Sequence, residues 1–249
     1  MWHSCAYQLT MALTATRQQL PAVADSIFKI GGGNGFVLQE DMALLQAYAG
    51  GVQLTLPQLQ SPKLNQFNPL TLSPNSATQS VTDGLEVCTF PYRPFVFRNQ
   101  EEVTAFATNG NAAANVDTII ASFSNGIDPI PPGETLTLTA TGATAAVANT
   151  WTLEPFTLTQ VLPEGIYAMI ASECISASGV HHRWTFWNQF YRPGMPSSTA
   201  FTNRQAACVR ELSLGLMGQF SNVTLPNLEV FCSAADAAFT ILMRVIKVA

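Results

Sequence analysis

Two adjacent histidines are the side chains in this sequence that come closest to a metal-binding or catalytic arrangement. They are His181 and His182. Neighbouring residues of a strand point to opposite faces, so this pair cannot bind one metal ion from that strand. We therefore expect one histidine to pack among aromatic side chains and the other to lie at the surface. His182 lies two residues before Trp184, which makes it a candidate pH sensor at a contact between subunits.

A glycine-rich segment at residues 31–35 is superficially similar to a phosphate-binding loop. It lacks the lysine that such a loop places after its last glycine, and no strand is expected before it. We predict a hinge instead, which would let residues 1–30 reach a neighbouring subunit. The predicted hinge residues are Gly31, Gly32, Gly33 and Gly35.

Other catalytic and metal-binding patterns are missing from the sequence. There is no G-x-S-x-G nucleophile motif, and the five cysteines contain no C-x-x-C pair. Glu101 and Glu102 are adjacent, so on a strand they would face opposite ways. Asp117 and Asp128 bracket a turn where calcium is conceivable, but a solvated loop is the favoured interpretation. The sequence thus predicts no enzyme, no metal and no cofactor.

Aromatic side chains gather between residues 184 and 191. We expect Trp184 and Phe186 to be core residues, because they alternate with polar residues of one strand. The aromatic residues that follow precede an Arg-Pro-Gly turn and are better placed for a surface contact. An exposed aromatic cluster also suits a sugar-binding platform. The predicted subunit-interface residues are Trp187, Phe190, Tyr191 and Arg192.

The scarcity of charge is the most unusual property of the composition. Charged residues make up 11% of the 249 residues, whereas hydrophobic residues make up 47%. Soluble domains typically contain about 25% charged residues. Interfaces of permanent assemblies are depleted of charge, so self-assembly is favoured over a surface that is merely polar and uncharged.

The charges that are present do not form a nucleic-acid-binding surface. The net charge is −5, and the lysines are Lys29, Lys63 and Lys247 alone. The arginines are scattered, and residues 1–28 contain one arginine and no lysine. Binding of a phosphate backbone needs clustered positive charge. We therefore predict no direct contact with nucleic acid.

The hydrophobic patterns predict an all-β chain with a different N-terminal segment. Residues 21–30 and 39–48 are predicted to be short helices, the second ending at Gly50–Gly51. From residue 52 onward, short alternating segments are separated by turn signals, which is typical of a β-sandwich or barrel. The predicted domains are an N-terminal arm, residues 1–50, and a β-sandwich, residues 51–249.

Several segments in the second half resemble jelly-roll capsid proteins of icosahedral tailless phages. The acidic chain without a basic arm resembles those of membrane-containing phages, which usually carry two jelly rolls. Here the strand count and the lack of a repeat favour one jelly roll plus an arm. The segments that carry the resemblance are Leu162–Ala171, Arg183–Phe186, Tyr191–Gly194 and Pro226–Asp236.

The resemblance implies a structural capsid protein that self-assembles into an icosahedral shell. Its partners would be copies of itself, as trimeric or pentameric building blocks, and also other virion proteins or an internal membrane. Its location would be the virion, assembled in the host cytoplasm. The alternative is a carbohydrate-binding β-sandwich module of a phage fibre or cell-surface protein. A hydrolase on a β scaffold ranks third, because no site supports it.

Overall fold

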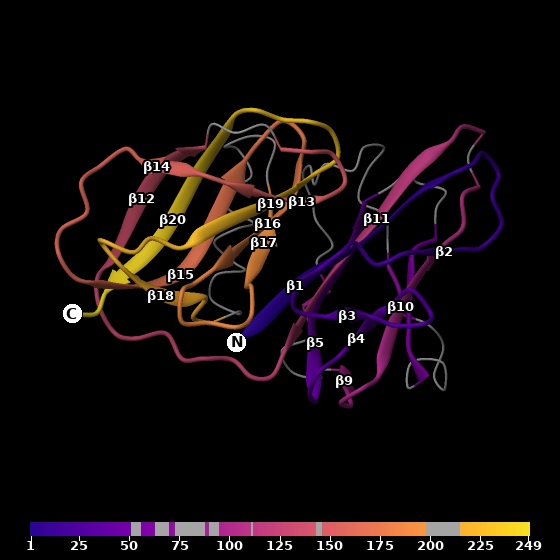
Figure 1. Ribbon diagram of the computed structural model, residues 1–249, viewed down its shortest axis with the longest axis horizontal. Helices are drawn as coiled ribbons and strands as arrows, with labels where there is room; N and C mark the ends of the chain where they lie inside the picture. The colour runs from indigo at the N-terminus through magenta and orange to yellow at the C-terminus, as the bar shows by residue number, and fades with distance from the viewer. Residues whose placement is uncertain are drawn as a thin grey trace. The chain divides into compact units, whose positions relative to one another are not determined.

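The computed structural model describes residues 1–50, 56–62, 70–72, 88–89, 95–110, 112–142, 146–197 and 215–249. Every element whose bounds it defines is a β-strand (Figure 1). The predicted all-β class is therefore confirmed for the described residues. Within them, no helix is long and apolar enough to cross a membrane.

The chain forms two compact units. The N-terminal unit is Cys5–Asn125, and the C-terminal unit combines Met1–Ser4 with Gly126–Ala249. The predicted boundary at residue 50 falls inside the N-terminal unit, because residues 1–50 supply strands to its sheets. Residues 5–50 thus belong to the same compact unit as residues 51–125.

The described strands of the N-terminal unit form two sheets. One has the order β1-β11-β5-β8, with β9 also paired to β5, and the other has the order β3-β4-β10-β6-β7, with β2 also paired to β10. The strands are β1 (Trp2–Met11), β2 (Gln18–Leu20), β3 (Lys29–Ile30), β4 (Phe36–Val37), β5 (Met42–Gly50), β6 (Gln58–Gln60), β7 (Leu70–Thr71), β8 (Cys88–Thr89), β9 (Phe95–Phe97), β10 (Glu102–Ala107) and β11 (Asn115–Ser124).

The interior of the N-terminal unit is an aromatic cluster. The Phe123 ring makes edge-on contacts with Phe28 and Phe97, at centroid distances of 6.1 and 5.7 Å. Phe36 makes a similar contact with Tyr7 at 5.0 Å. The Tyr7 hydroxyl donates a hydrogen bond to the Val103 carbonyl at 2.7 Å, which links β1 of one sheet to β10 of the other. The two sheets therefore enclose a common core.

The predicted helices at residues 21–30 and 39–48 are wrong. The first range contains an isolated bridge at Ala22, a bend at residues 26–28 and β3. The second range overlaps β5, which pairs with β11 from Ala43 to Gly50. β5 is central in its sheet and buried on both faces. A continuous apolar run suits a helix face and a fully buried strand equally, so the spacing of apolar residues did not distinguish the two.

The C-terminal unit also contains two sheets in its described residues. Their orders are β14-β12-β20-β15-β18 and β13-β19-β16-β17. The rings of Phe156 and Trp184, one from each sheet, meet edge-on at 5.6 Å. The strands are β12 (Thr135–Gly142), β13 (Trp151–Glu154), β14 (Phe156–Leu158), β15 (Ile166–Ile175), β16 (Gly179–Thr185), β17 (Gly194–Pro196), β18 (Gly218–Ser221), β19 (Asn227–Cys232) and β20 (Phe239–Lys247).

Candidate functional site

The residues between β16 and β17, 186–193, form the segment that we call the aromatic loop. The structure confirms Trp184 and Phe186 as core residues, since both side chains are buried. Trp187 is 82% exposed and Phe190 is 61% exposed, as an interface on this loop would require. Tyr191 and Arg192 are half-buried. Their role in subunit contacts stays a prediction.

The base of the aromatic loop is anchored by hydrogen bonds. The Gln189 N–H donates to the Phe186 carbonyl at 3.1 Å, and the Trp184 N–H donates to the Pro193 carbonyl at 2.8 Å. The Phe190 ring packs edge-on against Tyr191 at 5.3 Å. The loop therefore presents its exposed aromatic side chains from a defined backbone.

Arg192 belongs to an ionic cluster in which one carboxylate lies between two guanidinium groups. Arg183 Nε is 2.6 Å from Glu229 Oε2, and Arg192 Nη1 is 2.8 Å from Glu229 Oε1. The Arg183 side chain is almost completely buried. Its second nitrogen donates to the Ser4 carbonyl at 2.8 Å, and its guanidinium lies 3.8 Å from the centre of the Trp151 ring. This cluster fastens residues 1–4, β13, β16 and β19 of the C-terminal unit together.

Both adjacent histidines are buried, so the prediction that one of them lies at the surface is wrong. His182 points toward the facing sheet and lies 2.7 Å from the Ser172 hydroxyl. His181 lies on the opposite face, beside the Trp151 ring at 6.0 Å. That face is covered because residues 1–4 belong to this unit, which the local sequence around His181 does not reveal.

The pair of Ser172 and His182 has the spacing of a nucleophile and its base, but it lies in the core. The Ser172 oxygen accepts a hydrogen bond from Trp184 Nε1 at 2.7 Å, which leaves the hydroxyl proton for His182 Nε2. Both Ser172 and His182 are buried. Burial lowers the pKa of His182 to about 3, so the ring is neutral at neutral pH. The geometry supports a structural hydrogen-bond network and gives a substrate no access.

The cysteine and acidic side chains do not assemble a metal site in the described part of the chain. No group of three or more His, Cys, Asp or Glu residues there is arranged to hold an ion. Cys5, Cys174 and Cys232 are buried free thiols. Burial raises the pKa of Cys232 to about 12, which keeps it a protonated thiol. The side chains of Cys88 and Cys208 lie outside the described set.

The predicted glycine hinge forms the turn of a short hairpin between β3 and β4. The Gly31 N–H donates to the Gly35 carbonyl at 2.9 Å. The N–H groups of Gly33 and Gly35 donate to the Glu102 carboxylate at 3.0 and 2.9 Å. A Cβ atom on Gly35 would lie 2.4 Å from the Val103 carbonyl oxygen, so this position requires glycine. Bending of this segment stays a prediction.

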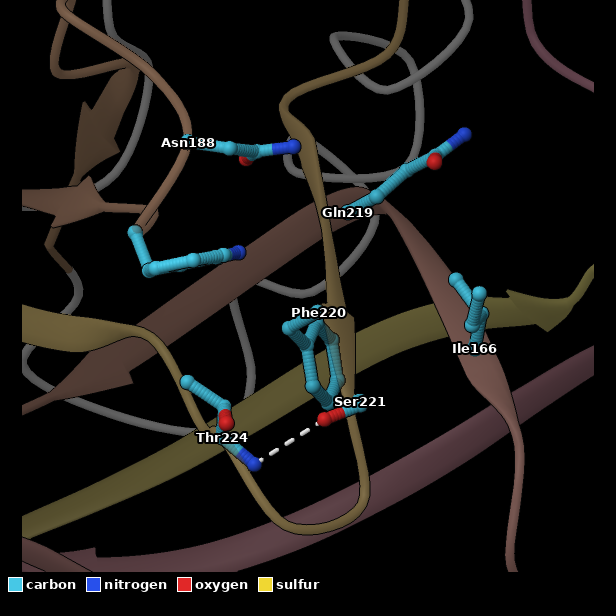
Figure 2. Close-up of a pocket in the computed structure, with 7 residues that line it drawn as sticks. Ile166, Asn188, Gln219, Phe220, Ser221 and Thr224 are labelled. Atoms are coloured by element: carbon cyan, nitrogen blue, oxygen red, sulfur yellow. Dashed lines mark hydrogen bonds between the residues drawn. The ribbon is translucent and has the colours of Figure 1, made fainter.

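A pocket of about 280 Å³ lies beside the aromatic loop (Figure 2). The loop contributes Trp187 and Asn188, and edge strand β18 contributes residues 219–221. β18 pairs with β15 in the register Ile166↔Ser221. The Thr224 N–H donates to the Ser221 hydroxyl at 3.0 Å, which closes the turn beneath the pocket. The lining residues are Ile166, Trp187, Asn188, Gln219, Phe220, Ser221 and Thr224.

Sequence reasoning found Trp187 but missed the polar side of this pocket. Gln219 and Ser221 alternate with buried Phe220 along a short strand. That alternation indicates a half-exposed strand, but a strand pattern does not name its neighbour. Only the pairing of β18 with β15 places these residues beside the aromatic loop.

Comparisons with known proteins identify no family. No protein-family model matches the chain, and no curated protein matches it. A crystal structure of the major capsid protein P2 from bacteriophage PM2 is similar to it, with a TM-score of 0.24 and 13% sequence identity. The match covers 94% of this chain and 98% of that chain. A likeness with this TM-score carries no conclusion about the fold or function of this chain.

Proposed function

We propose that this chain is a structural subunit of an icosahedral virion shell and that it assembles with copies of itself. The observation that carries the proposal is the exposed aromatic loop on a charge-poor chain. Trp187 and Phe190 are 82% and 61% exposed, in a protein with 11% charged residues. Aromatic residues are enriched, and charged residues depleted, at the centres of protein interfaces. A second copy of the chain would shield the Phe190 ring, which does not line the pocket beside the loop, from water.

The shell subunit would not bind the genome directly. Phosphate binding needs arginine or lysine side chains that are free and clustered. Arg183 and Arg192, which lie close together in the fold, are both engaged by Glu229. The N-terminal 28 residues add one arginine and no lysine. Genome contact would then fall to another virion protein or be replaced by an internal membrane.

The strand order of the C-terminal unit supports a jelly-roll interpretation of that unit. The chain crosses repeatedly between the two sheets. The first and last strands after Gly126, β12 and β20, are neighbours in one sheet. Repeated crossing of the chain between two sheets is typical of Greek-key and jelly-roll sandwiches. The presence of a second two-sheet unit agrees with the double jelly rolls that the sequence resemblance implies, rather than with one jelly roll and an arm.

The proposal includes trimeric or pentameric building blocks, a virion location after assembly in the host cytoplasm, and no enzymatic activity. The Ser172–His182 pair is buried, so this pair does not supply a nucleophile that a substrate could reach. The alternative function, a carbohydrate-binding module that does not assemble, predicts a stable monomer instead.

Light scattering coupled to size-exclusion chromatography, together with negative-stain microscopy, tests the proposal. We expect the purified chain to form uniform oligomers or closed particles. Phe190→Asp places a charge in the proposed contact and should raise the protein concentration needed for assembly at least tenfold. Ile127→Asp, at a side chain that is 51% exposed in the same unit, is the matched control and should assemble normally. A wild-type chain that stays monomeric at all accessible concentrations would overturn the proposal.

A further inference from the structure

We infer that the pocket beside the aromatic loop binds a neutral sugar, one pyranose unit of a glycan, through the Trp187 ring and the amides of Asn188 and Gln219. This site goes beyond the proposed function, since a shell subunit does not need a ligand in order to assemble. It would let the outer surface of such a subunit recognise carbohydrate.

Trp187 supplies the surface on which a sugar ring would lie. Its side chain is 82% exposed, although its loop is held in place by backbone hydrogen bonds at both ends. An indole combines a broad apolar face with one N–H donor. A pyranose also has an apolar face, made of axial C–H groups, and it carries hydroxyl groups around its rim. Stacking of these two faces removes apolar surface from water and leaves the hydroxyls free for the neighbouring amides.

The amides of Asn188 and Gln219 supply hydrogen bonds for those hydroxyls. Asn188 comes from the aromatic loop and Gln219 comes from β18, so the two amides belong to different elements that border the pocket (Figure 2). Both residues are exposed at the surface of the described structure. Each amide offers two N–H donors and one carbonyl acceptor, which match a hydroxyl that both donates and accepts.

The polar floor of the pocket is formed before any ligand binds. The Ser221 hydroxyl accepts the Thr224 N–H and keeps its own proton available to a ligand. Asn222, next to Ser221, accepts from the Gly165 N–H at 3.2 Å and donates its own N–H to the Gly165 carbonyl at 3.2 Å. These bonds hold the turn against the start of β15. A site that is ordered in advance loses less conformational entropy on binding.

The lining chemistry and the size of the pocket define the class of ligand. None of its seven lining residues is charged, so the pocket offers no counterion to a phosphate, a sulfate or an acidic sugar. Its polar groups are amides and hydroxyls, which suit a neutral polyol. Its volume of about 280 Å³ is near the lower end of the range of small-molecule sites, roughly 300–1,000 Å³. One sugar unit therefore fits better than a long oligosaccharide.

Saturation-transfer difference NMR with the full chain tests the inference directly. The probes are the methyl glycosides of glucose, galactose, mannose and N-acetylglucosamine, with methyl glucuronide as the anionic comparison. We expect saturation transfer to at least one neutral glycoside, strongest at the axial C–H protons that face the indole. Methyl glucuronide should bind at least threefold more weakly. The absence of transfer to every neutral glycoside would overturn the inference.

Variants at the pocket separate sugar binding from other uses of the loop. Trp187→Ala should weaken the binding of the preferred glycoside at least tenfold, and Gln219→Ala should weaken it about threefold to tenfold. Phe190→Ala removes an exposed ring of the same loop that does not line the pocket, so it should leave binding unchanged. Binding that survives Trp187→Ala undiminished would also overturn the inference.

Assembly of the same proteins is scored separately by light scattering. Gln219→Ala should assemble like the wild-type chain even though its sugar binding is weakened. A wild-type chain that binds the glycoside but never assembles would overturn the proposed shell function and leave the sugar site standing. Particles that form normally but give no saturation transfer would overturn the sugar site and leave the proposed shell function standing.

Discussion

The two units have similar architectures, but their interiors are built from different chemistry. Between the sheets of the N-terminal unit, aromatic rings meet edge-on around Phe123. Between the sheets of the C-terminal unit, a hydroxyl joins an imidazole and an indole at Ser172, His182 and Trp184. The C-terminal unit also buries the guanidinium of Arg183. The C-terminal unit therefore adds a hydrogen-bonded polar network to apolar ring contacts such as that between Phe156 and Trp184.

This difference predicts which unit is more sensitive to single substitutions. Apolar packing is distributed over many weak contacts, so the loss of one group leaves the others in place. A buried polar group depends on one or two specific partners, and it becomes costly when one of them is removed. The C-terminal unit should therefore respond more strongly to the loss of a single polar atom and to acid.

The largest effect is expected for Glu229→Ala in the C-terminal unit. The substitution leaves the guanidinium groups of Arg183 and Arg192 without the carboxylate that lies between them. Removal of one partner of a buried ion pair typically costs about 3–5 kcal/mol of folding free energy. Urea unfolding would measure the loss, and hydrogen exchange of peptides from each unit would locate it in the C-terminal unit.

The exposed ion pair of Arg98 and Asp41 in the N-terminal unit is the matched control. Its side chains are 77% and 50% exposed, so water screens their attraction. Asp41→Ala should leave the urea midpoint within experimental error of the wild type. Equal losses of folding free energy for Asp41→Ala and Glu229→Ala would mean that the buried and the exposed ion pair contribute equally to stability.

A smaller loss is expected for Ser172→Ala, which removes one hydroxyl from the interior of the C-terminal unit. His182 Nε2 and Trp184 Nε1 both lose their partner at Ser172. An unsatisfied buried polar group costs about 1–3 kcal/mol. Urea unfolding measures the change. A loss of folding free energy below about 0.5 kcal/mol, the low end for one net hydrogen bond, would mean that this network contributes little to stability beyond apolar packing.

Acid should weaken the C-terminal unit through His182. The pKa of this histidine is about 3 in the folded protein and 6.5 in its unperturbed form. Between these values the unfolded chain binds a proton that the folded chain does not, so stability is complete above pH 6.5 and falls as the pH decreases. The slope is at most about 1.4 kcal/mol per pH unit.

Urea midpoints at pH 7.5 and pH 5.0 would measure this dependence. His182→Gln removes the titrating group and should give a smaller difference between the two midpoints than the wild-type chain gives. An unchanged difference would assign the acid sensitivity to other groups.

The smallest effect is expected for Tyr7→Phe in the N-terminal unit. The substitution removes the hydrogen bond to the Val103 carbonyl and keeps the ring contact with Phe36. Burial raises the pKa of Tyr7 well above 10, so the lost group is a neutral hydroxyl. The net loss should be about 0.5–1.5 kcal/mol, measured by urea unfolding. A larger loss than that of Ser172→Ala would contradict the predicted difference between the units.

The alternation of apolar and polar residues in the sequence was sufficient to predict the burial of some residues at the candidate site. The alternation of residues 182–186 predicted that Trp184 and Phe186 are buried, and both are. The prediction for Trp184 and Phe186 succeeded because strand alternation depends on neighbouring residues alone. Of the four predicted interface residues, Trp187 and Phe190 are exposed, whereas Tyr191 and Arg192 are half-buried, and their role in subunit contacts stays a prediction.

Local pattern failed where burial depends on distant parts of the chain. Residues 39–48 are predicted to be a helix because their apolar side chains fit one, but β5 overlaps this range, and pairing with β11 makes it a central strand. One of the two adjacent histidines is predicted to lie at the surface, but both are buried. Residues 1–4 lie on the His181 face of the sheet, where the Ser4 carbonyl accepts a hydrogen bond from Arg183. In both cases the deciding partner lies far away in the sequence.

The sequence by itself determined the all-β class, the scarcity of charge and the exposed aromatic loop, because these follow from composition and short-range alternation. Only the tertiary structure decided that the chain forms two units, that Glu229 lies between Arg183 and Arg192, and that Gln219 lies near Trp187. Glu229 is 46 residues from Arg183 in sequence. Strand register brings such residues together, and register is set by the packing of whole sheets rather than by any one segment.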